Sequence, residues 1–165
     1  MDVSIKQHDT KGKFTDLLEA SINGAPVAPV DLNGCDASFL MKKTGIAFKR
    51  TAAIADTSPM TSGSLVIARQ YKIVTFVAGD DFSNVGAASN ASGVTFTATG
   101  TTPTTWTNGS TLQALPGQVE YQPVADDVAI KGLFKQEWEV VFPSGEILTF
   151  PNDGYNTVNI WADLG

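Results

Sequence analysis

Cysteine and histidine are nearly absent from this chain of 165 residues, which contains Cys35 and His8 and no other residue of either type. A single cysteine excludes an intrachain disulfide, and one cysteine with one distant histidine does not supply the ligands of a zinc site. A Ser-His-Asp or Cys-His arrangement would have to use His8, which lies beside Asp9 at the end of an expected strand. We therefore expect a surface histidine, a small residue in or near the core at Cys35, and neither a metal nor a cofactor.

Positive charge is also scarce. The chain has 11 Lys and Arg residues against 17 Asp and Glu residues, for a formal net charge of −6, and no Lys, Arg or His lies between Ile73 and Ile130. Because a phosphate backbone requires a cationic surface, we expect no nucleic-acid partner. No apolar run approaches the ~20 residues of a membrane-spanning helix, and residues 1–6 lack the layout of a signal peptide, so we expect no membrane partner either.

Two pairs of adjacent carboxylates, Asp80-Asp81 and Asp126-Asp127, are the remaining candidates for chemistry. Adjacent side chains on a strand point to opposite faces, and on a turn they meet mainly solvent. No Asp-x-Asp-x-Asp calcium loop accompanies either pair. The pattern predicts solvated turns or a helix N-cap, with a weak calcium site as the alternative. We expect surfaces rather than catalytic machinery, and so no enzyme.

Apolar and polar residues alternate with a period of two along most of the chain, which is typical of strands with one buried face. In the clearest case, residues 134–142, Phe134, Trp138 and Val140 alternate with lysine and glutamate, and Pro143-Ser144-Gly145 predicts a tight turn into a hairpin partner. The strands predicted in this way are 3–7, 14–20, 37–43, 46–54, 71–77, 94–99, 134–142, 147–150 and 155–161, with one helical turn near 125–130. Their number and spacing predict an all-β protein of the β-sandwich class.

Residues 64–115 differ in composition from the rest. They hold one Arg, one Lys and two Asp, and half of the threonines of the chain lie between Thr95 and Thr111. Glycines recur at 79, 86, 93 and 100 without similar residues between them, which favours turns between short strands over a repeat or a nucleotide loop. We therefore expect a small Thr- and Gly-rich β module at 64–115, inserted into a loop of a discontinuous domain formed by 1–63 and 116–165.

The inserted segment contains one residue with the surroundings of a binding surface. Trp106 lies among hydroxyl and amide side chains, including Thr105 and Asn108, a composition found on sugar-binding and protein-contact surfaces. The alternative is that Trp106 caps the small core of the inserted module.

The last predicted strand, 155–161, suggests a second surface. Val158 and Ile160 occupy one face of this strand, which leaves Trp161 on the other face, with Tyr155 at the start. We expect this strand and the N-terminal strand to pair with a neighbouring chain through exposed edges. On that hypothesis Trp161→Ala weakens assembly more than it weakens folding.

Several distinctive short motifs lie in the two end segments of the chain, 1–62 and 116–165. They are 4–10 (SIKQHDT), 30–34 (VDLNG), 37–42 (ASFLMK), 132–142 with Glu137-Trp138-Glu139-Val140 at its centre, 144–146 (SGE) and 149–155 (TFPNDGY). This combination resembles the N-terminal domain of phage baseplate upper proteins. The segments 71–75, 79–82 and 96–101 look like a module that recurs in phage tail and fibre proteins.

The resemblance implies an immunoglobulin-like sandwich whose core includes Phe39, Met41, Phe48, Trp138, Val140 and Phe142. It also implies a non-enzymatic structural protein of the virion, in the tail or baseplate, assembled in the bacterial host cytoplasm. Its partners are other virion proteins, and it forms a homo-oligomer within the particle. Since proteins of that family continue into receptor-binding segments, we expect a shortened relative used elsewhere on the particle.

Three other functions stay open on the sequence. A capsid decoration (cement) protein uses the same sandwich with added loops and has other neighbours in the particle. A host-glycan-binding module would depend on Trp106 and the threonine-rich loops. An enzyme, the weakest alternative, needs a carboxylate pair brought together by folding.

Overall fold

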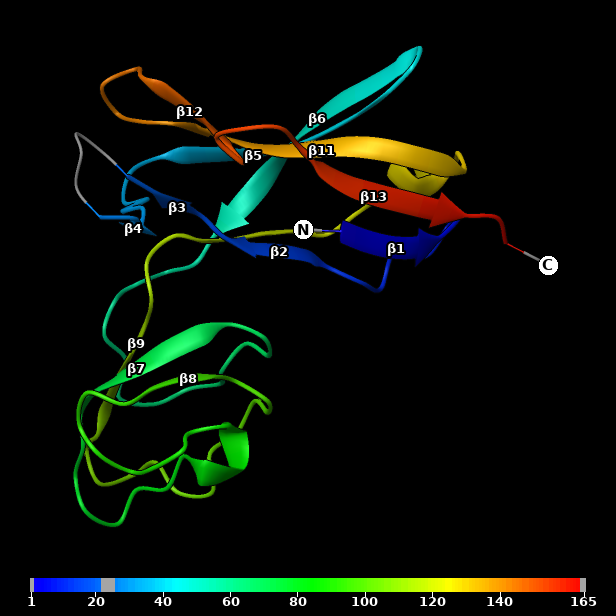
Figure 1. Cartoon of the computed structure of the whole chain (residues 1–165). Helices are drawn as coiled ribbons and strands as arrows, with labels where there is room; N and C mark the ends of the chain where they lie inside the picture. Colours follow the sequence, from blue (N-terminus) through cyan, green and yellow to red (C-terminus); the bar gives the residue numbers. More distant parts are fainter. Residues whose placement is uncertain (1, 22–25, 164–165) are drawn as a thin grey trace. The chain divides into compact units, whose positions relative to one another are not determined.

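The computed structural model describes residues 2–21 and 26–163 and consists mainly of β-strands with short 3-10 helices (Figure 1). The all-β prediction is confirmed. The chain divides into two compact units: unit 1 comprises Met1–Ile54 and Gly117–Gly165, and unit 2 comprises Ala55–Pro116. Unit 2 therefore begins earlier than the inserted module expected at 64–115. The backbone of Met60 exchanges two hydrogen bonds with Leu112 (2.8 and 2.9 Å), which ties the preceding segment to unit 2.

Unit 1 contains a sheet that follows the order β1-β13-β11-β5-β6-β10-β2, with β12 also paired to β11. Neighbouring strands are antiparallel except β1 and β13, which run parallel. The strands β3 and β4 form a separate pair. The bounds in unit 1 are β1 (Asp2–Lys6), β2 (Phe14–Leu17), β3 (Glu19–Ala20), β4 (Ala28–Pro29), β5 (Asp36–Lys43), β6 (Ile46–Ile54), β10 (Gln118–Tyr121), the 3-10 helix η2 (Ala125–Val128), β11 (Gly132–Val141), β12 (Ile147–Phe150) and β13 (Asn156–Trp161).

The strand β6 takes part in two layers. Its first seven residues pair with β5, and its last two, Ala53 and Ile54, pair with β10. The ring of Phe39 on β5 lies against Phe14 of β2 (centroids 4.8 Å apart) and Tyr121 of β10 (4.7 Å). Since β10 and β2 lie two and three places from β5 in the strand order, a ring contact between them requires that the sheet folds back on itself and packs face to face.

The core of unit 1 lies between these two layers. Phe39, Trp138 and Val140 are completely buried, and Met41 is almost so. Phe48 and Phe142, which the sequence also assigned to the core, are half-buried and pack against its margin. Alternation explains much of this set, because β5 and β11 bury every second residue: in β11 the buried residues are Phe134, Gln136, Trp138 and Val140.

Unit 2 has a three-stranded sheet in the order β8-β7-β9, formed by β7 (Gln70–Thr75), β8 (Thr95–Thr97) and β9 (Thr111–Ala114). The predicted strands 71–77 and 94–99 correspond to β7 and β8, which pair with each other. A 3-10 helix, η1 (Ser83–Val85), lies between them in sequence. The core of this unit consists of Leu65, Tyr71, Ile73, Phe82, Val85, Ala87, Phe96, Ala98, Trp106, Leu112 and Ala114.

Glycine is required at one position of unit 2 for two separate reasons. Gly86 ends η1 with φ of +107°, and a Cβ placed there would lie 2.4 Å from the carbonyl oxygen of Thr97. Gly93 also has a positive φ (+90°), but a Cβ there would meet nothing within 4 Å. A side chain at Gly93 would therefore cause backbone strain alone, whereas a side chain at Gly86 would cause both backbone strain and a steric clash.

We expect Gly93→Ala to cost about 1–2 kcal/mol of the free energy of unfolding of unit 2, from the left-handed backbone alone. Gly86→Ala should cost clearly more, because the added methyl group also displaces a backbone carbonyl. Hydrogen exchange of the β7 and β8 amides in the two variants measures this difference. Equal losses of protection would show that the close approach of Thr97 to Gly86 is unimportant.

Candidate interaction surface

The larger layer of unit 1 has one face toward the core and one face away from it. On β11 the residues that alternate with the buried set are Leu133, Lys135, Glu137, Glu139 and Val141, and each is exposed or half-exposed. The flanking strands pair with β11 in register, so their alternate residues lie on the same side. We call this surface the outer face; it consists of those five residues, Ile147 and Thr149 near β12, Tyr155, Thr157, Asn159 and Trp161 near β13, and the outward residues of β1, β5 and β6.

Large hydrophobic side chains are unusually exposed on the outer face. Leu133 is 62% exposed, Ile147 61%, Trp161 58% and Tyr155 47%. A sandwich covers its apolar residues by turning them inward, so a group of four on one outward surface is a candidate for contact with another molecule.

Tyr155 and Trp161, which the sequence singled out, both lie on this face. Trp161 points away from the core, as the alternation of Val158 (0% exposed) and Ile160 (1%) predicts. The ammonium group of Lys135 lies 4.0 Å from the centre of the Tyr155 ring, a cation–π contact between neighbouring parts of the surface. Leu133 and Ile147 were missed, although the signal was present: each is an apolar residue in the polar phase of its strand.

The pairing of β13 corrects one expectation. Both of its edges are occupied, by β1 on one side and by β11 on the other, so β13 has no edge to offer a neighbouring chain. Within the described residues β1 pairs with β13 alone and keeps a second edge open, as expected for the N-terminal strand. The prediction was wrong for β13 because a partner 155 residues away in the sequence leaves no local signal. What β13 presents to a neighbour is a side-chain face rather than an edge.

The structure places Trp106 in the core of unit 2. Its indole is 9% exposed, its ring meets Phe82 edge-to-face (centroids 5.7 Å apart), and its Nε1–H donates to the carbonyl oxygen of Ser110 (2.8 Å). This geometry favours the alternative that Trp106 caps the core, since a buried ring does not offer a face for stacking on a sugar. Thr105 is half-buried and its backbone pairs with Asp81.

Asp80 is buried, which corrects the expectation of a solvated turn. It is 3% exposed, and its Oδ1 accepts hydrogen bonds from the backbone N–H groups of Thr107 (2.8 Å) and Asn108 (2.9 Å) and from Nδ2 of Asn108 (3.0 Å). Its Oδ2 accepts from the N–H of Ser110 (3.0 Å). Burial by itself would raise the pKa of Asp80, but the hydrogen bonds from Ser110, Asn108 and Thr107 outweigh it and hold the pKa far below its usual value. Asn108 is exposed, and its backbone N–H and Nδ2 both donate to Asp80, so it anchors the loop.

The neighbouring Asp81 has a local role. Its Oδ1 accepts from the N–H (3.0 Å) and hydroxyl (2.6 Å) of Ser83 and from Nδ2 of Asn90 (2.8 Å). These bonds lower its pKa and fix the start of η1. The two carboxylates therefore bind different loops of unit 2: both oxygens of Asp80 and Oδ1 of Asp81 accept hydrogen bonds from protein donors.

The two carboxylates of the second acidic pair also differ in burial and in hydrogen bonding. Asp126 is exposed, while Asp127 is 4% exposed and accepts from Nη2 (2.8 Å) and Nε (3.0 Å) of Arg50, from the hydroxyl of Tyr121 and from the N–H of Val124 (3.1 Å). Burial and the hydrogen bond to Asp127 raise the pKa of Tyr121 to about 12. The helix N-cap expectation is not met by either residue: the N-cap of η2 is Val124, and Asp127 is the third residue of the helix, where its carboxylate accepts a hydrogen bond from the backbone N–H of Val124.

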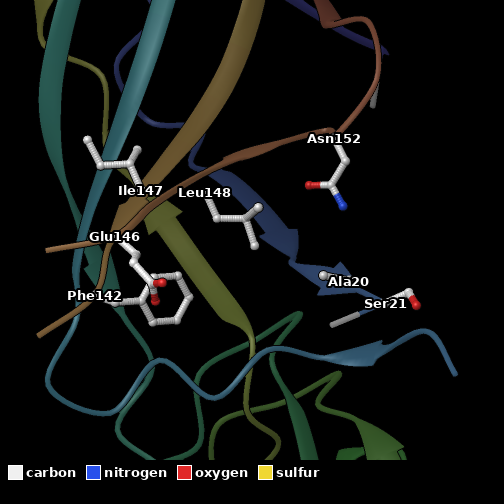
Figure 2. A pocket seen from close by; sticks show the side chains of 7 residues that line it. All are labelled: Ala20, Ser21, Phe142, Glu146, Ile147, Leu148 and Asn152. Atoms are coloured by element: carbon white, nitrogen blue, oxygen red, sulfur yellow. The ribbon is translucent and has the colours of Figure 1, made fainter. Parts of the chain in front are cut away.

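A pocket of about 590 Å³ lies beside the β11–β12 hairpin of unit 1. Figure 2 shows the ring of Phe142 and the side chain of Leu148 pointing into a hollow that Ala20 and Ser21 border from another side. Ile147, Glu146 and Asn152 complete the lining. Of these seven residues Glu146 alone is ionisable, so the lining does not contain the pair of titratable groups that acid–base catalysis uses.

The remaining sequence candidates are separate from one another. His8 is exposed in the turn after β1, and Cys35 is half-buried against the core of unit 1, where burial and the carboxylates of Asp31 and Asp36 raise the pKa of its thiol. Across residues 2–21 and 26–163, no three His, Cys, Asp or Glu side chains are grouped so as to hold a metal ion. The same residues include no helix long and apolar enough to cross a membrane. Comparison of the chain with protein families, with curated proteins and with solved structures finds no match.

Proposed function

We propose that this protein is a non-enzymatic structural component of a bacteriophage particle, in the tail or baseplate, and that it acts by assembly with neighbouring virion proteins. Unit 1 is then an immunoglobulin-like sandwich and unit 2 an inserted module of the kind seen in tail and fibre proteins. The chain would be assembled into particles in the bacterial cytoplasm. The motifs that resemble baseplate upper proteins, 4–10 and 132–155 above all, motivate the viral part of this proposal.

The observation that carries the assembly role is the outer face of unit 1. Four large hydrophobic side chains, each between 47% and 62% exposed, lie on this face: Leu133, Ile147 and Trp161 belong to strands, and Tyr155 directly precedes β13. Exposed apolar side chains rimmed by charged ones are typical of protein–protein contact surfaces. Their placement supports a protein whose function lies in what it packs against.

Purified particles of the phage that encodes this chain provide the test. We expect mass spectrometry to detect the chain in particles, and gold-labelled antibodies to bind the tail or baseplate. Labelling of the head would instead assign the chain to capsid decoration and contradict the tail location. If the chain stays in the unassembled fraction of the lysate, the structural role itself is wrong.

A further inference from the structure

The strand β1 has backbone hydrogen-bonding groups that point away from its own sheet. Among the strands that the structure describes, β1 pairs with β13 alone (Figure 1). Lys6 lies opposite Trp161, and the N–H of the next residue, Gln7, donates to the carbonyl oxygen of Trp161 (2.9 Å). In a parallel pair every second residue turns both of its backbone groups toward the neighbouring strand. The odd-numbered residues of β1 therefore face β13, and the backbone groups of Ser4 and Lys6 face the free edge.

The sequence of β1 is symmetric in residue class about Ser4. Val3 and Ile5 flank it, and the acidic Asp2 and the basic Lys6 follow on the two sides. When two copies of such a strand run antiparallel about a two-fold axis at Ser4, residue 2 of each copy lies opposite residue 6 of the other, and residue 3 lies opposite residue 5. Every acidic position then meets a basic one, and every apolar position meets an apolar one, which are the cross-strand pairs that stabilise a sheet.

The backbone groups fit the same register. In an antiparallel pair, opposite residues exchange two hydrogen bonds only where both face the partner strand. Ser4 and its copy meet this condition, and so do residues 2 and 6. The carbonyl oxygen of Lys6 already accepts from the N–H of Asp9 (3.2 Å), so the bonds of the Ser4 pair and the N–H of Lys6 contribute most. A shift by one residue would place a residue that faces the edge opposite one that faces β13, and a shift by two would separate the acidic and basic residues.

The free edge of β1 is also open to pairing because of the residues that it lacks. Natural edge strands are often protected by proline or by charged residues that point inward. Residues 2–6 contain no proline, and the inward residues Val3 and Ile5 are apolar. Both are half-buried and pack against the margin of the unit 1 core. A second β1 beside them would cover the part of each side chain that is still exposed.

The opposite edge of the same layer does not have this complementarity. The first seven residues of β6 pair with β5, and β10 reaches only Ala53 and Ile54. The segment 46–52 contains Lys49 and Arg50 and no acidic residue. Pairing of β6 with its own copy would therefore bring cations together without a counter-charge, which destabilises a sheet. Of the two edges, β1 is the one whose residues complement a second copy of themselves.

We propose that β1 binds β1 of a second copy of this chain, antiparallel and about a two-fold axis at Ser4, so that the sheet continues from one molecule into the next. The strand order across the axis becomes β11-β13-β1-β1-β13-β11. The inference rests on the proposed assembly function and names one partner and the edge that binds it. A contact through five residues of each copy is smaller than the ~1,200 Å² at which standard interfaces begin, so the dimer is weak and forms at high local concentration.

Proline at position 4 tests the role of the backbone. Ser4→Pro removes the N–H that faces the free edge and leaves the groups that bond to β13 in place. In sedimentation velocity at ~0.15 M salt, we expect the unaltered full chain to dimerise below about 1 mM and the Ser4→Pro variant to bind itself at least ~10-fold more weakly. Ser4→Ala keeps the N–H and should dimerise like the unaltered chain. Far-UV circular dichroism verifies that each variant is folded.

Exchange of the charges at residues 2 and 6 tests the register and does not depend on proline. Lys6→Glu places two acidic residues opposite each other, and Asp2→Lys places two basic ones, so each variant alone should dimerise at least ~10-fold more weakly. An equimolar mixture of the two variants should dimerise again, because each of its 2–6 pairs joins opposite charges. Lys42→Glu on β5 makes the same change in net charge away from the edge and should leave dimerisation unchanged.

Hydrogen exchange locates the contact. The amide of Ser4 should become protected as the protein concentration rises, whereas protection of the Ile5 amide, which faces β13, should stay constant. A chain that is monomeric up to about 1 mM would overturn the proposal, as would a Ser4 amide that exchanges equally fast at all concentrations. Species larger than a dimer would instead indicate pairing of β1 with β6 of the next copy and would contradict the two-fold axis.

These outcomes are distinct from failure of the proposed function. A monomer that is nevertheless found in purified particles leaves the structural role intact and removes the dimer. A dimer that is absent from particles removes only that role.

Discussion

Phe39→Ala should cost unit 1 about 3–5 kcal/mol of its free energy of unfolding, the range for truncating a fully buried aromatic residue. The ring of Phe39 is completely buried and contacts Phe14, Tyr121 and Trp138, with centroids 4.7 to 5.0 Å apart. These partners come from both layers of the sandwich, so the variant loses the group that joins them and leaves a cavity at their centre.

Two comparisons make this result specific. Phe39→Leu keeps most of the volume and should cost clearly less, and Phe48→Ala removes a ring that is only half-buried at the margin of the same core. Hydrogen exchange of the β5 and β11 amides reports the stability of unit 1, and exchange of the β7 amides reports that of unit 2. A loss for Phe39→Ala no larger than that for Phe48→Ala would show that the stacked rings do not hold the layers together.

Asp80→Asn should destabilise unit 2 by about 2–3 kcal/mol, because hydrogen bonds to a buried charged acceptor are stronger than those to a neutral one. The carboxylate accepts four hydrogen bonds from the loop 107–110, and an amide nitrogen in place of one oxygen would face a donor instead of binding it. Asp81→Asn is the matched neighbour; its partners lie in short local turns, and we expect a smaller loss.

The same residue predicts how acid affects unit 2. The pKa of Asp80 is lower in the folded state than the ordinary value of about 4, so the unfolded chain binds its proton more tightly. The stabilisation by Asp80 is therefore complete above about pH 4 and is lost as pH falls toward the folded pKa. Exchange of the β7 and β9 amides between pH 6 and pH 2.5 should show this loss, with a shallower slope in Asp80→Asn. Parallel slopes for both proteins would contradict the role assigned to the buried carboxylate.

Strands with long alternation, or with a clear turn beside a long strand, could be predicted from the sequence, and other short strands could not. The predicted 46–54 coincides with β6, because apolar residues mark one face over much of its length, and 147–150 coincides with β12, because the turn at 143–145 makes it the hairpin partner of 134–142. The strands β9 and β10 were missed, since Thr111–Ala114 and Gln118–Tyr121 span four residues each. Two alternations in four residues do not separate a strand from a loop, and burial of Leu112 and Val119 depends on partners elsewhere in the chain.

The interaction surface was predictable only in part. The outward direction of Trp161 follows from its neighbours in the strand, but the gathering of Trp161 with Leu133, and of Ile147 with Val141, depends on which strands pair. The burial of Asp80 has the same origin, because its hydrogen-bond donors lie 27 to 30 residues later in the sequence. The alternation of apolar and polar residues within a strand predicts which face a side chain lies on. The residues that it contacts depend on which strands are neighbours in the sheet.

The parallel pairing of β1 with β13 has a consequence for protein synthesis. Unit 2 is continuous in sequence, so all of it is synthesised before β10, β11, β12 and β13 of unit 1. β5 can pair with β6 early, but its other edge has no partner until β11 is made, and β1 has no partner until β13 is made. Since chains grow at ~5–20 residues per second, we expect unit 2 to be able to fold before unit 1 is complete, while β1 and one edge of β5 lack partners for seconds.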